Sequence, residues 1–218
     1  MTEQRITDDS PASALFPEFD TLYDLIANEV RGLTDAQLDW TSDDFAWAEW
    51  SVRNQLSHMA SLLYRWLILR CGDNLFPDGD HGIEDIQSVA DSPSDRRLDD
   101  DKYWEVQVIL EMLDGGIRLA QRVLSERTVG FIHSHSIASE MSASWDLMLQ
   151  AHPEGISVSE DGAQRIMRYD AMVRHMYFEE TTHLFNIQRL KRAQGLPTVS
   201  ETPSVGYWAV DGWDISEA

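Results

Sequence analysis

Apolar residues recur every three or four positions in four segments of the chain, and this spacing places them on one face of a helix. The segments span residues 19–33, about 51–70, about 101–126 and about 160–194. Gly195 and Pro197 follow the last segment, in the order that is typical of a helix end. The pattern predicts four helices.

Local signals support the predicted helices and their packing. Ser51 stands where an N-cap is expected, and Thr34 with Gln37 forms the spacing of a capping box that opens a short helical turn. Gly115 and Gly116 lie in the middle of the third segment, where two glycines cost on the order of 2 kcal/mol relative to alanine. They predict a bend or a close contact with another helix.

The connections between the helices are unequal in length. Residues 72–100 are polar, acidic and interrupted by proline and glycine, and a crossover of this length allows helices two and three to run parallel. Residues 127–159 show a mixed pattern. The tail, 198–218, is irregular, but its tryptophans predict that it packs onto the helices. We therefore expect one all-α domain over 1–218, an up-down-down-up four-helix bundle with its core at about 15–197.

The composition excludes several functions. A formal net charge of −21 argues against binding to nucleic acid, which needs clustered Lys and Arg, and against docking on anionic membranes. The single cysteine, Cys71, rules out an internal disulfide and a Cys-rich zinc site. No apolar run approaches the roughly 20 residues of a membrane span, and the first ten residues lack the apolar stretch of a secretion signal. We expect a cytoplasmic protein.

The fourth predicted helix carries two polar residues within its apolar stripe. The stripe consists of Met172, Met176, Glu179, His183, Ile187 and Leu190. Glu179 and His183 are one turn apart, so both side chains can reach one metal ion. The alternative is a Glu–His hydrogen bond at the edge of the core, because a buried carboxylate needs a cation, a proton or a donor.

The second predicted helix offers a third ligand. His58 lies beside its apolar stripe, where a histidine is on its own more often a buried core residue. Facing Glu179 and His183, it would complete a set of two imidazoles and one carboxylate, the pattern of catalytic zinc and related divalent metals. His175, one turn before Glu179, is an alternative ligand or a partner of the ligands.

Three stretches resemble motifs of the DinB-like (DinB/YfiT-like) metalloenzymes. Residues 50–58, WSVRNQLSH, resemble the W-S-x-x-x-x-L-x-H that opens the second helix in that family. Residues 33–40, LTDAQLDW, resemble its L-s-x-e-q-l-x-w loop, and residues 179–187, EETTHLFNI, resemble its H-E-x-x-H-x-x-Q-I. The three stretches follow the order and spacing of the family, and the resemblance extends over roughly residues 15–197.

Two positions depart from the family pattern. Glu179 stands where the family has its first histidine, and Asn186 stands where it has glutamine. A His, Glu, His set is that of the thiol-dependent branch, the mycothiol-dependent maleylpyruvate isomerases and their relatives. The resemblance implies a four-helix bundle with a divalent metal on His58, Glu179 and His183 and a low-molecular-weight thiol as second cofactor. We expect no counterpart of the further C-terminal domain of those isomerases in this sequence, and the resemblance therefore does not extend to their substrate.

These observations lead to three functional hypotheses. The first is a metal-dependent S-transferase or isomerase that acts on a small molecule, with zinc, nickel or iron bound, and with Arg53, Arg65 or Arg174 receiving an anionic substrate. The second is a non-catalytic metal-binding stress protein or a dimerisation bundle, in which the tail tryptophans serve a homodimer. The third is a metal-dependent hydrolase with Glu180 or His175 as base.

Overall fold

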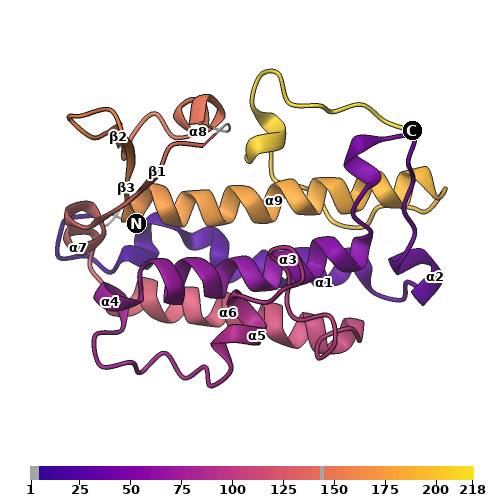
Figure 1. Cartoon of the computed structure of the whole chain (residues 1–218), viewed down its shortest axis with the longest axis horizontal. Helices are drawn as coiled ribbons and strands as arrows, with labels where there is room; N and C mark the ends of the chain where they lie inside the picture. The colour runs from indigo at the N-terminus through magenta and orange to yellow at the C-terminus, as the bar shows by residue number, and fades with distance from the viewer. Residues whose placement is uncertain (1–4, 143–144) are drawn as a thin grey trace.

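The computed structural model describes residues 5–142 and 145–218, which form a mostly helical fold with a small sheet (Figure 1). The α-helices are α1 (Leu22–Val30), α2 (Asp35–Leu38), α3 (Val52–Tyr64), α4 (Gly72–Leu75), α5 (Ile86–Ala90), α6 (Val106–Glu126), α7 (Val129–Ser134), α8 (Trp145–Ala151) and α9 (Tyr169–Ala193). The strands are β1 (Ser136–Glu140), β2 (Ile156–Val158) and β3 (Gln164–Arg168). Short 3₁₀ turns occur at η1 (Ala12–Leu15), η2 (Pro17–Asp20), η3 (Ala46–Ala48) and η5 (Tyr207–Ala209), and η4 (Arg65–Arg70) is π-helical.

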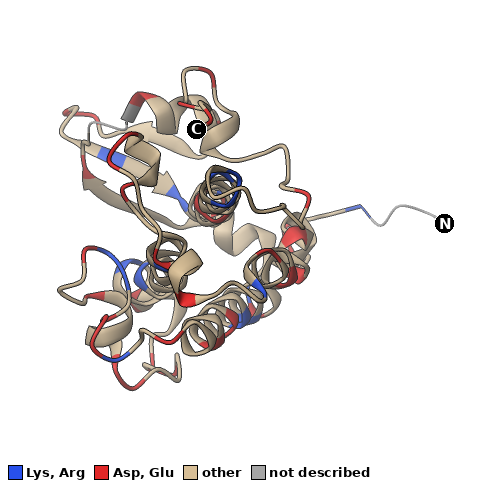
Figure 2. Cartoon of the chain, turned by 90° about the vertical axis from the view of Figure 1, so that its right-hand side faces the viewer, with Lys and Arg blue, Asp and Glu red and all other residues tan. Residues whose placement is uncertain are grey.

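The helices α1, α3, α6 and α9 lie side by side, as the view along their axes shows (Figure 2). Helix α3 packs against α6 and α9, and α1 also contacts both of them. Their apolar faces are fully buried between them, for example at Leu22, Leu56 and Met176. Removal of this apolar surface from water is the main force that holds the four helices together.

Helices α3 and α6 run in the same direction. Arg53, at the start of α3, donates to the carbonyl oxygen of Trp104 just before α6 (2.7 Å), and Tyr64, at the end of α3, donates to that of Met112 (2.7 Å). The long connection between them therefore returns the chain to the end where α3 began, as the length of this crossover predicts.

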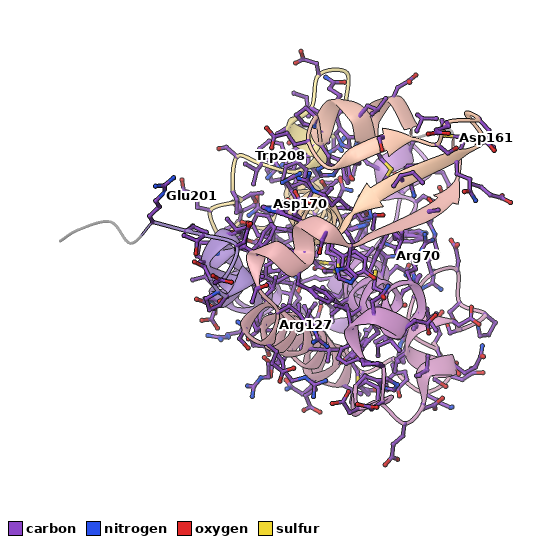
Figure 3. All side chains as sticks on the ribbon, turned by 90° about the vertical axis from the view of Figure 1, so that its left-hand side faces the viewer. Arg70, Arg127, Asp161, Asp170, Glu201 and Trp208 are labelled. Carbon is purple, nitrogen blue, oxygen red and sulfur yellow. The ribbon has the colours of Figure 1, made fainter. Side chains whose placement is uncertain are left out.

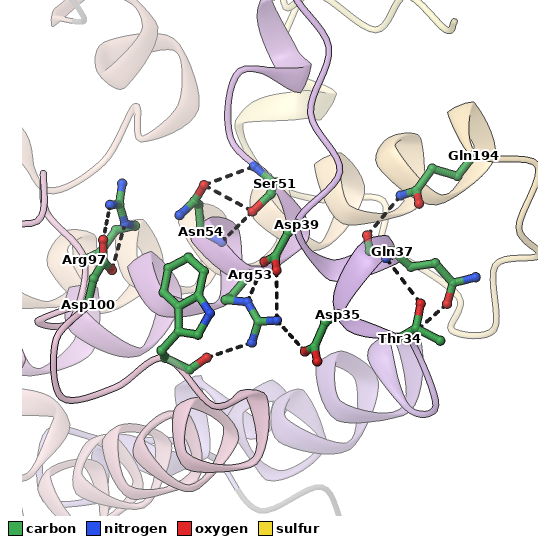
Figure 4. A network of polar contacts seen from close by, with 11 residues as sticks. Thr34, Asp35, Gln37, Asp39, Ser51, Arg53, Asn54, Arg97, Asp100 and Gln194 are labelled. Atoms are coloured by element: carbon green, nitrogen blue, oxygen red, sulfur yellow. Dashed lines mark hydrogen bonds and ion pairs between the residues drawn. The ribbon is translucent and has the colours of Figure 1, made fainter.

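The predicted caps and the close helix contact are present. The Ser51 hydroxyl accepts from the amide of Asn54 (3.2 Å), and Thr34 forms a capping box with Gln37 (Figure 4). A Cβ placed on Gly115 would lie 2.6 Å from the Tyr64 hydroxyl. Because these glycines carry no side chain, α6 can approach α3 closely.

The expectation of an all-α fold is wrong between residues 136 and 168. This segment contains an antiparallel sheet in the order β1-β3-β2, with Ile166 opposite Ala138 on one side and Ser157 on the other. Gly162, at φ +73°, closes the β2–β3 hairpin, and the neighbouring Asp161 lies at the outer tip of the sheet (Figure 3). The fourth helix, expected from about residue 160, therefore begins at Tyr169.

Helices α1 and α6 are also shorter than predicted, whereas α3 and the π-helical η4 together span the second predicted helix. Helix α1 spans Leu22–Val30 because 3₁₀ turn η2 precedes it, and α6 begins at Val106 rather than near residue 101. The acidic residues Asp100 and Asp101, which precede α6, lie in turns, and Asp100 is paired with Arg97 (2.6 Å). The spacing of apolar residues does not distinguish an isolated turn from the first turn of a helix.

The tail packs against α9, as its tryptophans predict. The ring of Trp208 stacks on Phe185 with centroids 4.6 Å apart, and Tyr207 is only 3% exposed. Arg189 of α9 holds the end of the tail by donating to the carbonyl oxygens of Asp214 and Ser216. Among the described residues, no helix is both long and apolar enough to cross a membrane.

Candidate metal centre

Two packed helices bring the three predicted ligands together. His58 lies on α3, and Glu179 and His183 lie one turn apart on α9. One ligand atom from each of the three residues lies within 4.8 Å of the other two. His183 Nε2 is 3.4 Å from a carboxylate oxygen of Glu179, and the rings of His58 and His183 are 4.5 Å apart. The predicted convergence of the three side chains is therefore present.

Both imidazoles are held through the nitrogen that faces away from the carboxylate. His58 Nδ1 donates to the carbonyl oxygen of Arg96 (3.0 Å), and His183 Nδ1 donates to the side-chain oxygen of Gln55. Because a carbonyl oxygen only accepts, the proton of each neutral ring lies on Nδ1 and the Nε2 lone pair is left for a metal. This arrangement is typical of metal-binding histidines. A Glu–His hydrogen bond at the core edge, the alternative reading, does not require it.

The electrostatics of the three residues suit a divalent cation. Burial, followed by the neighbouring His183, lowers the pKa of His58 well below its usual value, so the ring is neutral at pH 7. Burial alone would raise the pKa of Glu179, but the nearby imidazoles of His183, His175 and His58 lower it below the usual range. Two imidazoles and one carboxylate are a donor set that zinc, nickel and iron accept.

The three residues form part of the wall of a pocket of about 570 Å³. The aromatic part of its wall consists of Trp47, Trp50, Tyr207 and Trp213. The ring of Trp50 is centred 5.1 Å from that of His58 and 6.3 Å from that of His183. Arg96 is the one Lys or Arg side chain among the residues that line the pocket. The pocket has room for a small organic molecule beside the candidate ligands.

His175 lies behind the site and does not line the pocket. It is 5% exposed, its Nδ1 is 2.5 Å from the hydroxyl of Tyr207, and the same nitrogen is 4.0 Å from Glu179. The hydroxyl of Tyr207 also contacts the buried His152 (2.9 Å). Burial lowers the pKa of His175 to about 4. The neutral His175 therefore belongs to a buried His–Tyr–His cluster next to Glu179.

The three arginines expected to receive an anionic substrate are engaged elsewhere. Arg53 is paired with Asp35 (2.7 Å) and Asp39 (2.6 Å), as Figure 4 shows. Arg65 donates to a backbone carbonyl (2.6 Å), and Arg174 donates to the carbonyl oxygen of Glu154 (2.8 Å). None of the three lines the pocket, so this expectation is wrong.

Glu180, considered above as a base, is also absent from the pocket wall. Its side chain is completely buried, and neither carboxylate oxygen has a hydrogen-bond partner. Burial, followed by the charge of Glu179, raises its pKa well above the usual value. A protonated carboxyl group in the core cannot accept a proton from a substrate.

Sequence reasoning missed four residues of the site: Gln55, Arg96, Tyr207 and Trp213. The position of Gln55 near the site is predictable from the sequence, because Gln55 lies three positions before His58, on the same helical face. The other three lie in the long connection and in the tail, where no periodicity predicts which side chains point inward.

Comparisons of this chain with protein-family models, with curated proteins and with solved structures found no match. The functional argument therefore rests on the geometry of the site and on the motifs in the sequence.

Proposed function

We propose that this chain is a divalent-metal-dependent enzyme of the DinB-like group that binds its metal through His58, Glu179 and His183. The observation that carries the proposal is the convergence of these ligand atoms within 4.8 Å. The carbonyl acceptors on both Nδ1 atoms support it further, because they leave both Nε2 atoms free for a metal.

The chemistry that we propose is thiol-dependent S-transfer or isomerisation of a small molecule. A divalent metal lowers the pKa of a thiol or water that binds to it and so supplies a nucleophile at neutral pH. The aromatic part of the wall beside the ligands suits an organic substrate. His58 and His183 would hold the metal through their free Nε2 atoms, and Glu179 would supply the negative charge.

The positions of the family-like motifs support the DinB-like assignment and a four-helix arrangement of α1, α3, α6 and α9. In the first motif Ser51 caps α3, which fixes where the helix that carries His58 begins. In the loop motif Asp35 and Asp39 bind Arg53 from the next segment of the chain. Ser51 thus has a structural role at a named position of its motif, whereas Asp35 and Asp39 occupy open positions of the loop motif.

Two alternatives have less support. Hydrolysis needs a base near the metal, and the residues considered for this role, Glu180 and His175, do not line the pocket. A purely structural metal site is usually closed by protein ligands, whereas these three ligands border a pocket of about 570 Å³.

The first test is the metal content of protein purified without a metal-affinity column. We expect about one equivalent of zinc, nickel or iron by elemental analysis. His183→Ala should lose most of it because it removes a ligand, and the control His175→Ala should keep most of it because His175 Nδ1 is bound to Tyr207. Loss of metal in the control but not in His58→Ala would contradict the ligand assignment.

The second test concerns the thiol. In cobalt-loaded protein the visible absorption spectrum should change when glutathione or another small thiol is added, and His183→Ala should abolish the change. Activity on ester substrates without a thiol effect would favour the hydrolase instead.

A further inference from the structure

A strained turn in the connection between α3 and α6 lies against the candidate metal centre. The amide of Arg97 donates to the carbonyl oxygen of Ser94 (3.0 Å), which closes a four-residue turn. Its central residues, Asp95 (φ 42°) and Arg96 (φ 61°), are the only non-glycine residues with positive φ in the described part of the chain. Such turns usually contain Asn-Gly, because a bulky side chain is strained at positive φ.

The carbonyl oxygen of Arg96 receives two hydrogen bonds from α3 and the segment that follows it. His58 Nδ1 donates to it (3.0 Å), and Arg65 Nη2 also donates to it (2.6 Å). A third link ties the chain after the turn to α3, since the amide of Leu98 donates to the hydroxyl of Ser57 (3.1 Å). A strained backbone persists where its surroundings fix it from several sides, and such places are often functional.

We propose that the Ser94–Arg97 turn is a positioning element of the metal centre. It holds the Arg96 carbonyl against His58 Nδ1, which fixes the proton on that nitrogen and aims Nε2 at Glu179 and His183. Arg65 is a positioning residue that acts through this carbonyl. The effect on metal affinity rests on the proposed function, whereas the effect on the His58 proton does not require a metal.

The side chain of Arg96 offers a second way in which this residue contributes to the site, apart from its backbone carbonyl. Its guanidinium lies over the ring of Trp50, 5.2 Å from the centroid, at the edge of the pocket. It is 61% exposed, and its ion pair with Asp95 (3.4 Å) is also exposed. A test must therefore separate the backbone carbonyl of Arg96 from its guanidinium.

Two substitutions at Arg96 make this separation. Both Arg96→Gly and Arg96→Val remove the guanidinium, but only glycine keeps the positive φ, since a β-branched residue is strongly disfavoured there. We expect Arg96→Gly to bind zinc within about twofold of the wild type and Arg96→Val to bind it about tenfold more weakly, the loss typical of a disturbed ligand support. Equal affinities for the two variants would overturn the proposal.

The second measurement uses metal-free protein. Nitrogen-15 NMR of the imidazoles should show the His58 proton on Nδ1 in the wild type and in Arg96→Gly, and a mixture of the two ring forms in Arg96→Val. If the wild type binds no metal but shows this pattern, the proposed function fails and the positioning role stands. A ring form unaffected by Arg96→Val would refute the positioning role itself.

Arg65 provides an independent variant outside the turn. Arg65→Met removes one of the two donors to the Arg96 carbonyl, so zinc affinity should fall severalfold and the His58 ring forms should mix. The matched control is Arg97→Met, because Arg97 lies in the same turn but pairs with Asp100. A similar change in both variants would mean that general damage to the loop, rather than support of the carbonyl, causes the effect.

Discussion

Two buried glutamates show that the effect of a buried carboxyl group on stability depends on its hydrogen-bond and ion-pair partners. Glu29 is 1% exposed, is paired with Lys191 and accepts from the amides of Val199 (3.0 Å) and Ser200 (2.7 Å). Glu180 is as deeply buried but has no hydrogen-bond partner. Removal of one partner from a buried ion pair leaves the other charge without compensation, whereas a buried carboxyl group without a partner already carries an uncompensated desolvation cost.

Substitution of these glutamates should have opposite effects. Glu29→Gln should lower the free energy of unfolding by about 3 kcal/mol at pH 7, because Lys191 would be left buried without its counter-charge. Glu180→Met should raise it by about 1–3 kcal/mol, because it removes a carboxyl group without a partner. Denaturant unfolding of the two variants and the wild type measures both changes.

The contributions of Glu29 and Glu180 to stability should also change in opposite directions with pH. Burial is outweighed at Glu29 by its donors, which lower its pKa, so its contribution to stability is present above the unfolded pKa and is lost as the pH falls through the folded value. Burial raises the pKa of Glu180, so the wild type loses stability as the pH rises above 4.5. The advantage of Glu180→Met should therefore shrink between pH 7 and pH 5. A constant advantage would mean that the carboxyl group does not titrate as its burial implies.

For single residues, the sequence predicts which side chains share a helical face, but it does not predict which partners fix the orientation of these side chains. Helical spacing places Glu179 and His183 together. It contains no information on Arg96, which supports His58 from 38 positions away. The Arg96 carbonyl gives the buried His58 a hydrogen-bond partner that does not depend on a metal.

At the scale of elements, the contact between α3 and α6 depends on the absence of side chains. Helix α6 presents Gly115 to the hydroxyl of Tyr64 and Gly116 to the side chain of Leu63. The Tyr64 hydroxyl uses the space to reach the carbonyl oxygen of Met112. The two helices are thus close enough for a side chain of one to bond the backbone of the other.

Gly115→Ala should therefore destabilise the protein, although alanine is the better helix former. The added Cβ would lie 2.6 Å from the Tyr64 hydroxyl, and overpacking of this kind costs about 1–3 kcal/mol. Adding Tyr64→Phe should recover part of the loss, because it removes the clashing oxygen. The control is Gly72→Ala in α4, where nothing lies within 4 Å of the new Cβ. Thermal unfolding of these three variants and the wild type tests the contact, and a higher melting temperature for Gly115→Ala would contradict it.

The long helices were predictable because their stripes extend over several turns, and the sheet was missed because its strands have three to five residues. Strand β3 directly precedes α9, so in the sequence the apolar residues of β3 resemble a continuation of the apolar stripe of α9. The pair Asp161–Gly162 is a readable turn signal, and it argues against a helix that begins at residue 160.

On the scale of the whole molecule, acidic charge dominates the surface. Figure 2 shows Asp and Glu spread over most elements, with Lys and Arg scattered among them. The net charge of −21 is carried almost entirely at the surface, because buried cations such as Arg53 and Lys191 are offset by buried acids such as Glu29. Repulsion between like charges therefore opposes the compact state.

Salt should stabilise this molecule. Raising potassium chloride from 10 to 500 mM shortens the range of charge repulsion, so the melting temperature should rise by a few degrees, which corresponds to about 1 kcal/mol in a chain of this size. The same charge predicts that labelled duplex DNA will not bind at physiological salt. A melting temperature that falls with salt, or nanomolar binding of DNA, would contradict these two expectations.

The position of Trp50 has a practical consequence for spectroscopy. Its indole lies next to both candidate imidazole ligands, close enough for a paramagnetic ion such as cobalt to quench its fluorescence. The protein thus carries an intrinsic optical reporter of its own site. Occupancy can be followed by emission intensity without a dye, and Trp50→Phe identifies the part of the signal that this indole contributes.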